Sequence, residues 1–291
     1  MAEVSPAARG SFIERLSDPG LLLAVELRPP RSNLPSSEGL EAWIDANHSL
    51  RRLSELQTVV FLTDNAVGRK EEENLQHLLS NVGSDLDANK IVPFLTCKHT
   101  LDYCAWYAQR AAQGGFRGLV VVGGDSHDGV PRCFPHAYQL RRSIREKLPE
   151  LLLGGWANPY REATEQVGFL TEASFEGNFF LTQVVSHFNL APVERFLSEA
   201  DRQGLKLPGV FGVFYFRSDN PRTFARLSRF MPVPEESLKA AFARGATADE
   251  VCAQTIEALL SFGVRKFYIS NLPTADAHRV LTRLRRMVEE R

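Results

Sequence analysis

The sequence predicts a single domain with the (β/α)8 TIM-barrel fold over residues 1–291. Eight short apolar runs recur along the chain, most of them roughly thirty residues apart. Segments with helical periodicity fill the gaps, as right-handed βαβ units that carry a parallel sheet require. The length of 291 residues is somewhat above the ~250 residues typical of a closed barrel. An open doubly wound sheet of the same units is the alternative.

The predicted strands are these apolar runs. In chain order they are 21–25, 58–63, 91–96, 119–122, 151–155, 179–182, 210–216 and 266–269. Between them, 38–56 and 247–262 carry apolar residues at helical spacing, so their leucine and aromatic side chains are expected to fill the core. The gap before the last strand is the longest, and Pro232 and Pro234 divide it into two or three helices.

The composition is that of an ordinary globular protein, with 44% hydrophobic and 24% charged residues. Lys and Arg number 34 and Asp and Glu 35, so the formal net charge of -1 predicts no surface for nucleic acid or for a membrane. The N-terminus lacks a basic segment followed by an apolar one, and no run approaches the ~20 apolar residues of a membrane span. A cytoplasmic protein that acts on small molecules is therefore expected, whereas its oligomeric state is left open.

Four cysteines are scattered along the chain without any C-x-x-C pair. This distribution is typical of reduced, mostly buried thiols. A zinc site formed by Cys133, His127 and His136 would lack the usual spacing of metal ligands, so no metal is expected. The cysteines are Cys97, Cys104, Cys133 and Cys252.

One acidic residue, Glu26, follows the first apolar run and precedes the segment Arg-Pro-Pro-Arg at 28–31. Active sites of (β/α)8 barrels are assembled at the C-terminal ends of the strands, so this carboxylate is expected to face a pocket. Burial raises the pKa of a carboxyl group, which lets it hold a proton near neutral pH and act as a general acid. A structural ion pair with Arg28 or Arg31 is the alternative interpretation.

Polar residues also follow the other predicted strands, and each of them could be a helix cap. Gln183 differs, because it directly follows a strand and would present an amide with donors and an acceptor to the barrel mouth. Such a group suits the edge of a heterocycle. Gly123-Gly124-Asp125 lacks the G-x-G-x-x-G spacing, so a Rossmann dinucleotide fingerprint is absent. The polar residues at these strand ends include Thr63, Thr96, Asp125, Asn158, Gln183 and Ser270.

Taken in order, these strand ends resemble the methylenetetrahydrofolate reductase family, whose (β/α)8 barrels reduce 5,10-methylenetetrahydrofolate to 5-methyltetrahydrofolate. The resemblance covers nearly the whole chain and consists of short motifs in a shared order. They are Glu26 before Pro29-Pro30-Arg31, the segment 94–97 for the family's His-Leu-Thr-Cys, 123–125 for its Arg-Gly-Asp, Thr182-Gln183 for its Thr-Gln, and 208–210 for its Pro-Gly-Ile.

The resemblance implies two catalytic residues. Glu26 would protonate the imidazolidine ring of the folate, so that the ring opens to a 5-iminium cation, and Asp125 would favour that cation electrostatically. It also implies two substrate-binding residues. Gln183 would bond the pterin amide edge, and Phe216 would contact the aminobenzoate.

Several departures from the family fall at positions that contact FAD in its members. Phe94 replaces a histidine, Gly123 replaces an arginine, and a longer family motif is shortened to Trp-Ala-Asn-Pro at 156–159. FAD is therefore doubtful, and NADH or NADPH is expected in the vacated space, with direct hydride transfer to the iminium. A conventional FAD-dependent reductase and a non-catalytic folate-binding accessory subunit are the alternatives. The candidate cofactor-binding residues are Thr63, Thr96, Trp156 and Asn158.

Overall fold

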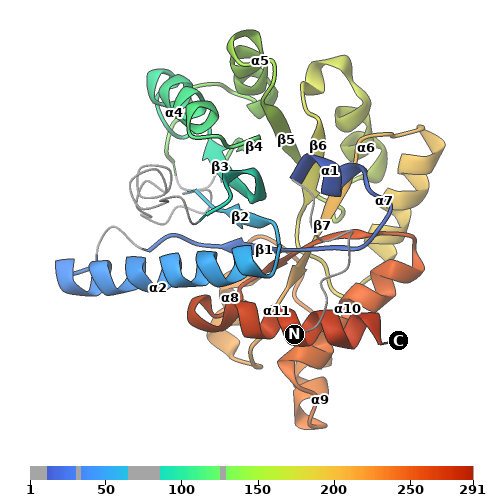
Figure 1. The fold of residues 1–291 in the computed structure, drawn as a ribbon. Helices are drawn as coiled ribbons and strands as arrows, with labels where there is room; N and C mark the ends of the chain where they lie inside the picture. Colours follow the sequence, from blue (N-terminus) through green and yellow to red (C-terminus); the bar gives the residue numbers. More distant parts are fainter. Residues whose placement is uncertain (1–11, 31–33, 65–85, 125–128, 291) are drawn as a thin grey trace.

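The computed structural model describes residues 12–30, 34–64, 86–124 and 129–290. They form a closed barrel of eight parallel strands that pair in sequence order, with helices around it (Figure 1). The predicted (β/α)8 fold is confirmed, and the open doubly wound sheet is wrong because β1 pairs with β8. The strands are β1 (Leu22–Leu27), β2 (Val60–Leu62), β3 (Ile91–Thr96), β4 (Gly118–Val122), β5 (Leu152–Ala157), β6 (Phe179–Thr182), β7 (Gly209–Phe214) and β8 (Lys266–Ser270).

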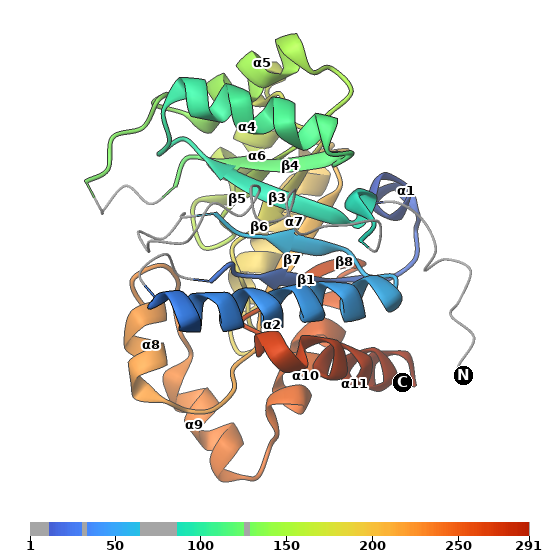
Figure 2. The same ribbon diagram turned by 60° about the vertical axis from the view of Figure 1, so that its left-hand side comes forward.

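Helices follow the strands and form the outer layer. In Figure 2, α4 and α5 lie on one side of the strands, and α2, α10 and α11 lie on the other. None of the helices in the described ranges is long and apolar enough to cross a membrane. The helices are α1 (Phe12–Ser17), α2 (Ser36–Glu55), α4 (Leu101–Gln113), α5 (Ala137–Lys147), α6 (Ala163–Thr171), α7 (Ala191–Arg202), α8 (Pro221–Leu227), α9 (Glu235–Ala243), α10 (Ala248–Ser261) and α11 (Ala277–Glu289), with 3₁₀ turns at Ala88–Lys90, Ala173–Phe175 and Thr274–Asp276.

The second strand is shorter than its apolar run, which extends over 58–63. Thr58 lies before β2 and not within it. Its backbone N–H donates to Leu53 O in α2 at 3.2 Å, and its hydroxyl donates to Leu23 O in β1 at 2.6 Å. These bonds end α2 and lead the chain into the sheet. The seventh strand likewise ends at Phe214, two residues before the end of its apolar run.

Side chains along each strand alternate between two cores, as the two-residue period of a β-strand requires. One core lies between the strands and the helices and contains Leu23 and Val25 of β1 together with Leu53 of α2. The other lies inside the barrel and contains Ala24 of β1 and Tyr268 of β8. The alternation therefore assigns every strand residue to the barrel interior or to the helix layer.

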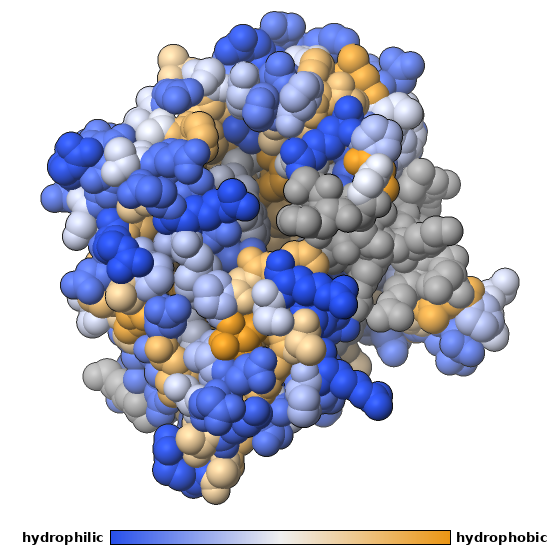
Figure 3. Space-filling model, turned by 180° about the vertical axis from the view of Figure 1, so that it is seen from behind, coloured by the Kyte–Doolittle hydropathy of each residue, from blue (hydrophilic) through white to orange (hydrophobic). Residues whose placement is uncertain are grey.

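The N-terminal end of the barrel is closed by α1. Phe12 is fully buried, and its ring meets Phe61 at 5.7 Å and Phe179 at 5.0 Å in edge-to-face geometry. Seen from behind Figure 1, on the side away from α1, the molecule is hollowed near its centre (Figure 3). A ligand can therefore enter at the C-terminal end of the strands.

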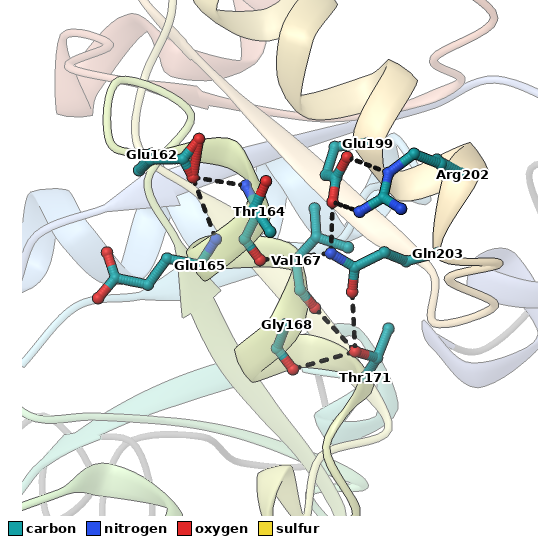
Figure 4. Close-up of polar contacts among 9 residues, drawn as sticks. All are labelled: Glu162, Thr164, Glu165, Val167, Gly168, Thr171, Glu199, Arg202 and Gln203. Carbon is teal, nitrogen blue, oxygen red and sulfur yellow. Dashed lines mark hydrogen bonds and ion pairs between the residues drawn. The ribbon is translucent and has the colours of Figure 1, made fainter.

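On the outside, a polar network joins α6 to α7 (Figure 4). Glu162 caps α6 by accepting from Thr164 N at 2.8 Å, and Gln203 Nε2 donates to Thr164 O at 3.3 Å. Glu199 accepts from Arg202 Nη2 at 2.6 Å, a bond that holds the pKa of this carboxyl near 2. The network lies on the surface and includes none of the predicted site residues.

The barrel interior leaves no room for a side chain at Gly154 of β5. A Cβ atom there would lie 2.5 Å from the ring of Phe179, which is itself fixed by Phe12. Gly154→Ala is therefore expected to lower the free energy of unfolding by about 1–3 kcal/mol through overpacking. Urea titration followed by circular dichroism measures this change.

Gly168→Ala provides the matched control, because a Cβ atom at this position in α6 meets nothing within 4 Å. It should raise the free energy of unfolding by roughly 0.5–1 kcal/mol, since alanine favours the helix. Equal changes for the two variants would contradict the close packing of the interior.

Candidate active site

Glu26 faces the barrel interior at the C-terminal end of β1. It shares the two-residue alternation of Leu22 and Ala24, which both belong to the interior core. Ser270, the last residue of β8, has the same orientation as Tyr268 in that core. Closure of the barrel between β8 and β1 brings the two together, and the Ser270 hydroxyl donates to Glu26 Oε1 at 2.9 Å.

Burial dominates the electrostatics of Glu26. Its side chain is only 10% exposed, and burial raises the pKa of the carboxyl above the ordinary value of 4.5. The positive charge of Arg28 and the Ser270 hydrogen bond act in the opposite direction but do not cancel this effect. Arg28 Nε lies 3.9 Å from Glu26 Oε1, at the outer limit of an ion pair. Arg31, the other predicted partner, lies outside the described residues.

Tyr268 lies on the interior face of β8, one interior position below Ser270. Its hydroxyl donates to Thr182 O at 2.6 Å, and the residue is fully buried. Burial, and secondly the nearby charge of Glu26, raise the pKa of this phenol well above its usual value. Tyr268 therefore stays protonated. Its hydrogen-bonded side chain fills the barrel interior on the N-terminal side of the Glu26 carboxyl group.

Three of the predicted cofactor-binding residues also have interior positions near the mouth. Thr63 follows Phe61 by two residues, Thr96 follows Phe94 by two, and Trp156 belongs to the interior face of β5. Trp156 is 37% exposed, which is unusual for a tryptophan on an interior face. Thr96 is fully buried, and its hydroxyl has no hydrogen-bond partner among the described residues.

Gln183 lies just beyond β6, as predicted. Its backbone N–H donates to Ala157 O at 2.8 Å, so the β5–β6 pairing extends to this residue. The side-chain carbonyl accepts from Val184 N at 3.0 Å. In the part of the chain that the structure describes, the amide nitrogen has no partner, so its two hydrogens are available to a ligand.

Two of the predicted contact residues, Phe216 and Asn158, have partners within the protein. Phe216 is only 2% exposed, and its ring packs against Phe214 at 4.8 Å and Phe224 at 6.1 Å. Asn158 forms a turn after β5, since its side-chain oxygen accepts from Tyr160 N at 3.1 Å. Asp125 lies outside the described residues, so its role stays a prediction.

The sequence did not predict the pair formed by Asp64 and His99. His99 Nε2 lies 2.8 Å from Asp64 Oδ2, and the same oxygen accepts from Thr96 N at 2.9 Å. The histidine ring also lies 4.5 Å from the ring of Tyr103. The sequence places the two residues after different strands, and only the adjacency of β2 and β3 joins them. His99 directly precedes Thr100, the N-cap of α4.

Ser270 was recognised only as one of the polar residues at the strand ends. No pattern in the sequence indicated that it meets Glu26, which is 244 residues away. No group of three or more His, Cys, Asp or Glu residues that could hold a metal ion occurs within the described ranges.

Comparison with known proteins reveals similarity of structure only. No protein-family model matches the chain, and no curated protein sequence matches it. The structure of an uncharacterized protein from Clostridium thermocellum, which binds two copies of 5-methyl-5,6,7,8-tetrahydrofolic acid, is similar with a TM-score of 0.69. It is 19% identical, and the match covers 94% of this chain and 96% of that one, which shows a shared fold. The aldolase QR15 matches over 100% of both chains at 11% identity, but its TM-score of 0.46 carries no argument.

The buried carboxyl of Glu26 predicts a specific dependence of stability on pH. Because its pKa is raised in the folded protein, its contribution to stability is complete below the ordinary value of 4.5 and is lost as the pH rises through the folded-state value. The Glu26→Gln variant has no carboxyl group to ionise at this position, so it does not lose this stability as the pH rises. The variant should gain free energy of unfolding relative to wild type as the pH rises from about 4 to 8, by ~1.4 kcal/mol if the folded-state pKa lies one pH unit higher.

Chemical denaturation at several pH values measures this difference. Glu41→Gln, on an exposed position of α2, is the control and should differ from wild type by a constant amount. A Glu26→Gln difference that shrinks with rising pH would mean that the carboxyl is stabilised in its charged form.

Proposed function

We propose that this protein is a flavin-independent methylenetetrahydrofolate reductase. It would reduce 5,10-methylenetetrahydrofolate to 5-methyltetrahydrofolate with a hydride taken directly from NADH or NADPH. The observation that carries the proposal is the buried, interior carboxyl of Glu26 at the C-terminal end of the strands, with its raised pKa. This is the environment that a proton donor to the folate ring needs. The similar fold of the folate-binding protein from Clostridium thermocellum supports a folate ligand.

In the proposed reaction, Glu26 gives its proton to the imidazolidine nitrogen that becomes the leaving group. The ring carbon–nitrogen bond then breaks, its electron pair stays on that nitrogen, and a 5-iminium cation forms. One hydride reduces the cation to the methyl group, so the reaction consumes one proton and one hydride. Ser270 holds the carboxyl in place during the transfer. Asp125 is assigned the stabilisation of the cation.

Binding of the folate would use the polar and aromatic groups at the mouth. The free amide hydrogens of Gln183 suit the carbonyl and ring-nitrogen acceptors of a pterin. Phe216 remains the proposed aminobenzoate contact, although its ring would have to separate from Phe214 to offer a face.

The nicotinamide would lie across the remaining interior positions. Trp156 offers an exposed aromatic face at the mouth, and the buried hydroxyl of Thr96 lacks a described partner. Thr63 lies on the neighbouring strand, and Asn158 would act through the turn that it forms after β5.

One observation supports the absence of FAD. Phe94, at the position of a family histidine, is 4% exposed and lies in the interior core near Phe61, so it offers no polar atom to a flavin. Gly123, at the position of a family arginine, has no side chain, but the guanidinium of Arg132 lies 3.2 Å from where its Cβ would be, so a guanidinium is still present there. The proposed absence of FAD therefore rests on Phe94.

The proposal is tested by anaerobic oxidation of NADH and then of NADPH by flavin-stripped protein with 5,10-methylenetetrahydrofolate. We expect substrate-dependent oxidation without added FAD, with 5-methyltetrahydrofolate as the product. Glu26→Gln should lower kcat by about 10²–10⁴-fold, the usual contribution of a general acid. Glu41→Gln should retain wild-type turnover.

The alternatives give different results in the same assay. Oxidation that begins only when FAD is added would identify a conventional flavoenzyme. Folate binding without oxidation under either condition would identify a non-catalytic accessory subunit. Full activity of Glu26→Gln would exclude Glu26 as the proton donor.

A further inference from the structure

Two arginines follow strands at the C-terminal end of the barrel, and one of them lies beside Glu26. Arg28 follows β1 by one residue, and its Nε lies 3.9 Å from Glu26 Oε1. Arg217 follows β7, and its Nε donates to Asn271 O at 2.9 Å. Asn271 directly follows Ser270, the hydrogen-bond partner of Glu26. Because β7, β8 and β1 are consecutive in the barrel, both guanidinium groups belong to the same part of the rim.

The backbone beneath Arg217 is fixed. Asn271 has a left-handed φ of 71°, and its side-chain amide donates to Tyr215 O at 3.0 Å. Arg217 uses only its Nε in the bond to Asn271, so both terminal NH₂ groups lack a protein partner among the described residues. The Arg28 side chain is 39% exposed and forms no hydrogen bond within them. The guanidinium groups of Arg28 and Arg217 thus present N–H donors to solvent, and the hydrogen bond to Asn271 O holds Arg217 in place.

The charge of this pair is poorly compensated. Burial is the main reason that the pKa of Arg217 is lowered; Tyr215 acts in the opposite direction, and the weaker repulsion from Arg28 lowers the pKa further, so the two guanidinium groups lie close enough to influence one another. In the described ranges, Glu26 is the only carboxylate within ion-pair distance of either arginine. The proposed reaction starts with Glu26 protonated and neutral. In that state the two positive charges have no counterion among the residues that the structure describes, so an anionic ligand would be attracted to them.

We propose that Arg28 and Arg217 bind the carboxylates of the glutamyl tail of the folate substrate. This inference rests on the proposed function and names the part of the substrate that the rim recognises. The glutamate of a folate is joined to the aminobenzoate, on the side of the ring nitrogen that Glu26 would protonate. Carboxylates at that end accept paired hydrogen bonds from guanidinium groups. The phosphates of a nicotinamide dinucleotide are also anionic and could bind the same arginines. The experiment distinguishes these phosphates from the glutamyl carboxylates.

The test is calorimetric titration of the wild-type protein with three ligands: the methylamide of 5-methyltetrahydropteroate (called the pteroate below), which has neither the glutamate nor a free benzoate carboxylate, and 5-methyltetrahydrofolate with one or three glutamates. We expect the monoglutamate to bind about tenfold or more tightly than the pteroate, as charge-assisted hydrogen bonds predict. The triglutamate should bind at least as tightly. The preference should decrease as salt is added.

Arg28→Gln with Arg217→Gln removes both charges and keeps side chains of similar length. The double variant should bind all three ligands with the affinity of wild type for the pteroate. Its affinity for NADH and NADPH should be unchanged. Arg222→Gln, an exposed arginine of the nearby α8, is the matched control and should behave as wild type.

The outcomes separate the two proposals. If wild type binds none of the ligands, the proposed function fails, and with it the inference. If wild type binds the pteroate and the glutamylated forms equally, the inference is wrong while folate binding stands. A double variant that loses affinity for NADH or NADPH instead would assign the arginines to the dinucleotide phosphates. The wild-type comparison decides the question even if the double variant does not fold.

Discussion

Burial of the Glu26 carboxyl at the end of an apolar strand is the constraint on which the proposed chemistry depends. The other interior positions of β1 are Leu22 and Ala24, and the carboxyl itself is 10% exposed. Charge is disfavoured there because the surroundings solvate it poorly. The Ser270 hydroxyl and the Arg28 guanidinium replace only part of the lost water. The carboxyl group is thus held in one orientation, and its raised pKa favours the protonated form.

The filled interior of the barrel decides from which side this carboxyl can meet a ligand. Phe12 closes the N-terminal end, and Phe61 and Tyr268 occupy the middle with their rings 6.0 Å apart. Polar or exposed interior side chains occur at the other end, where Glu26 and Trp156 lie. A ligand that meets Glu26 must therefore bind at the C-terminal end of the strands.

The places of several candidate residues in the fold could be predicted, because the active sites of (β/α)8 barrels lie at the C-terminal ends of the strands. Glu26 and Gln183 were identified from single positions after apolar runs, and the two-residue period places both toward the interior. Phe216 shows the limit of this reasoning. It lies two residues beyond the end of β7 and belongs to the same interior core as Phe214, but its ring packs against Phe214 and Phe224, which the two-residue period does not reveal.

The sequence by itself determined the number and order of the βα units and the apolar setting of Glu26, because both follow from local hydrophobic patterns. Only the tertiary structure decided the partners. Ser270 meets Glu26 across 244 residues because the last strand closes on the first, and Asp64 meets His99 because two short strands are neighbours. Pairing across strands depends on closure of the whole barrel, and a local pattern of residues carries no record of that closure.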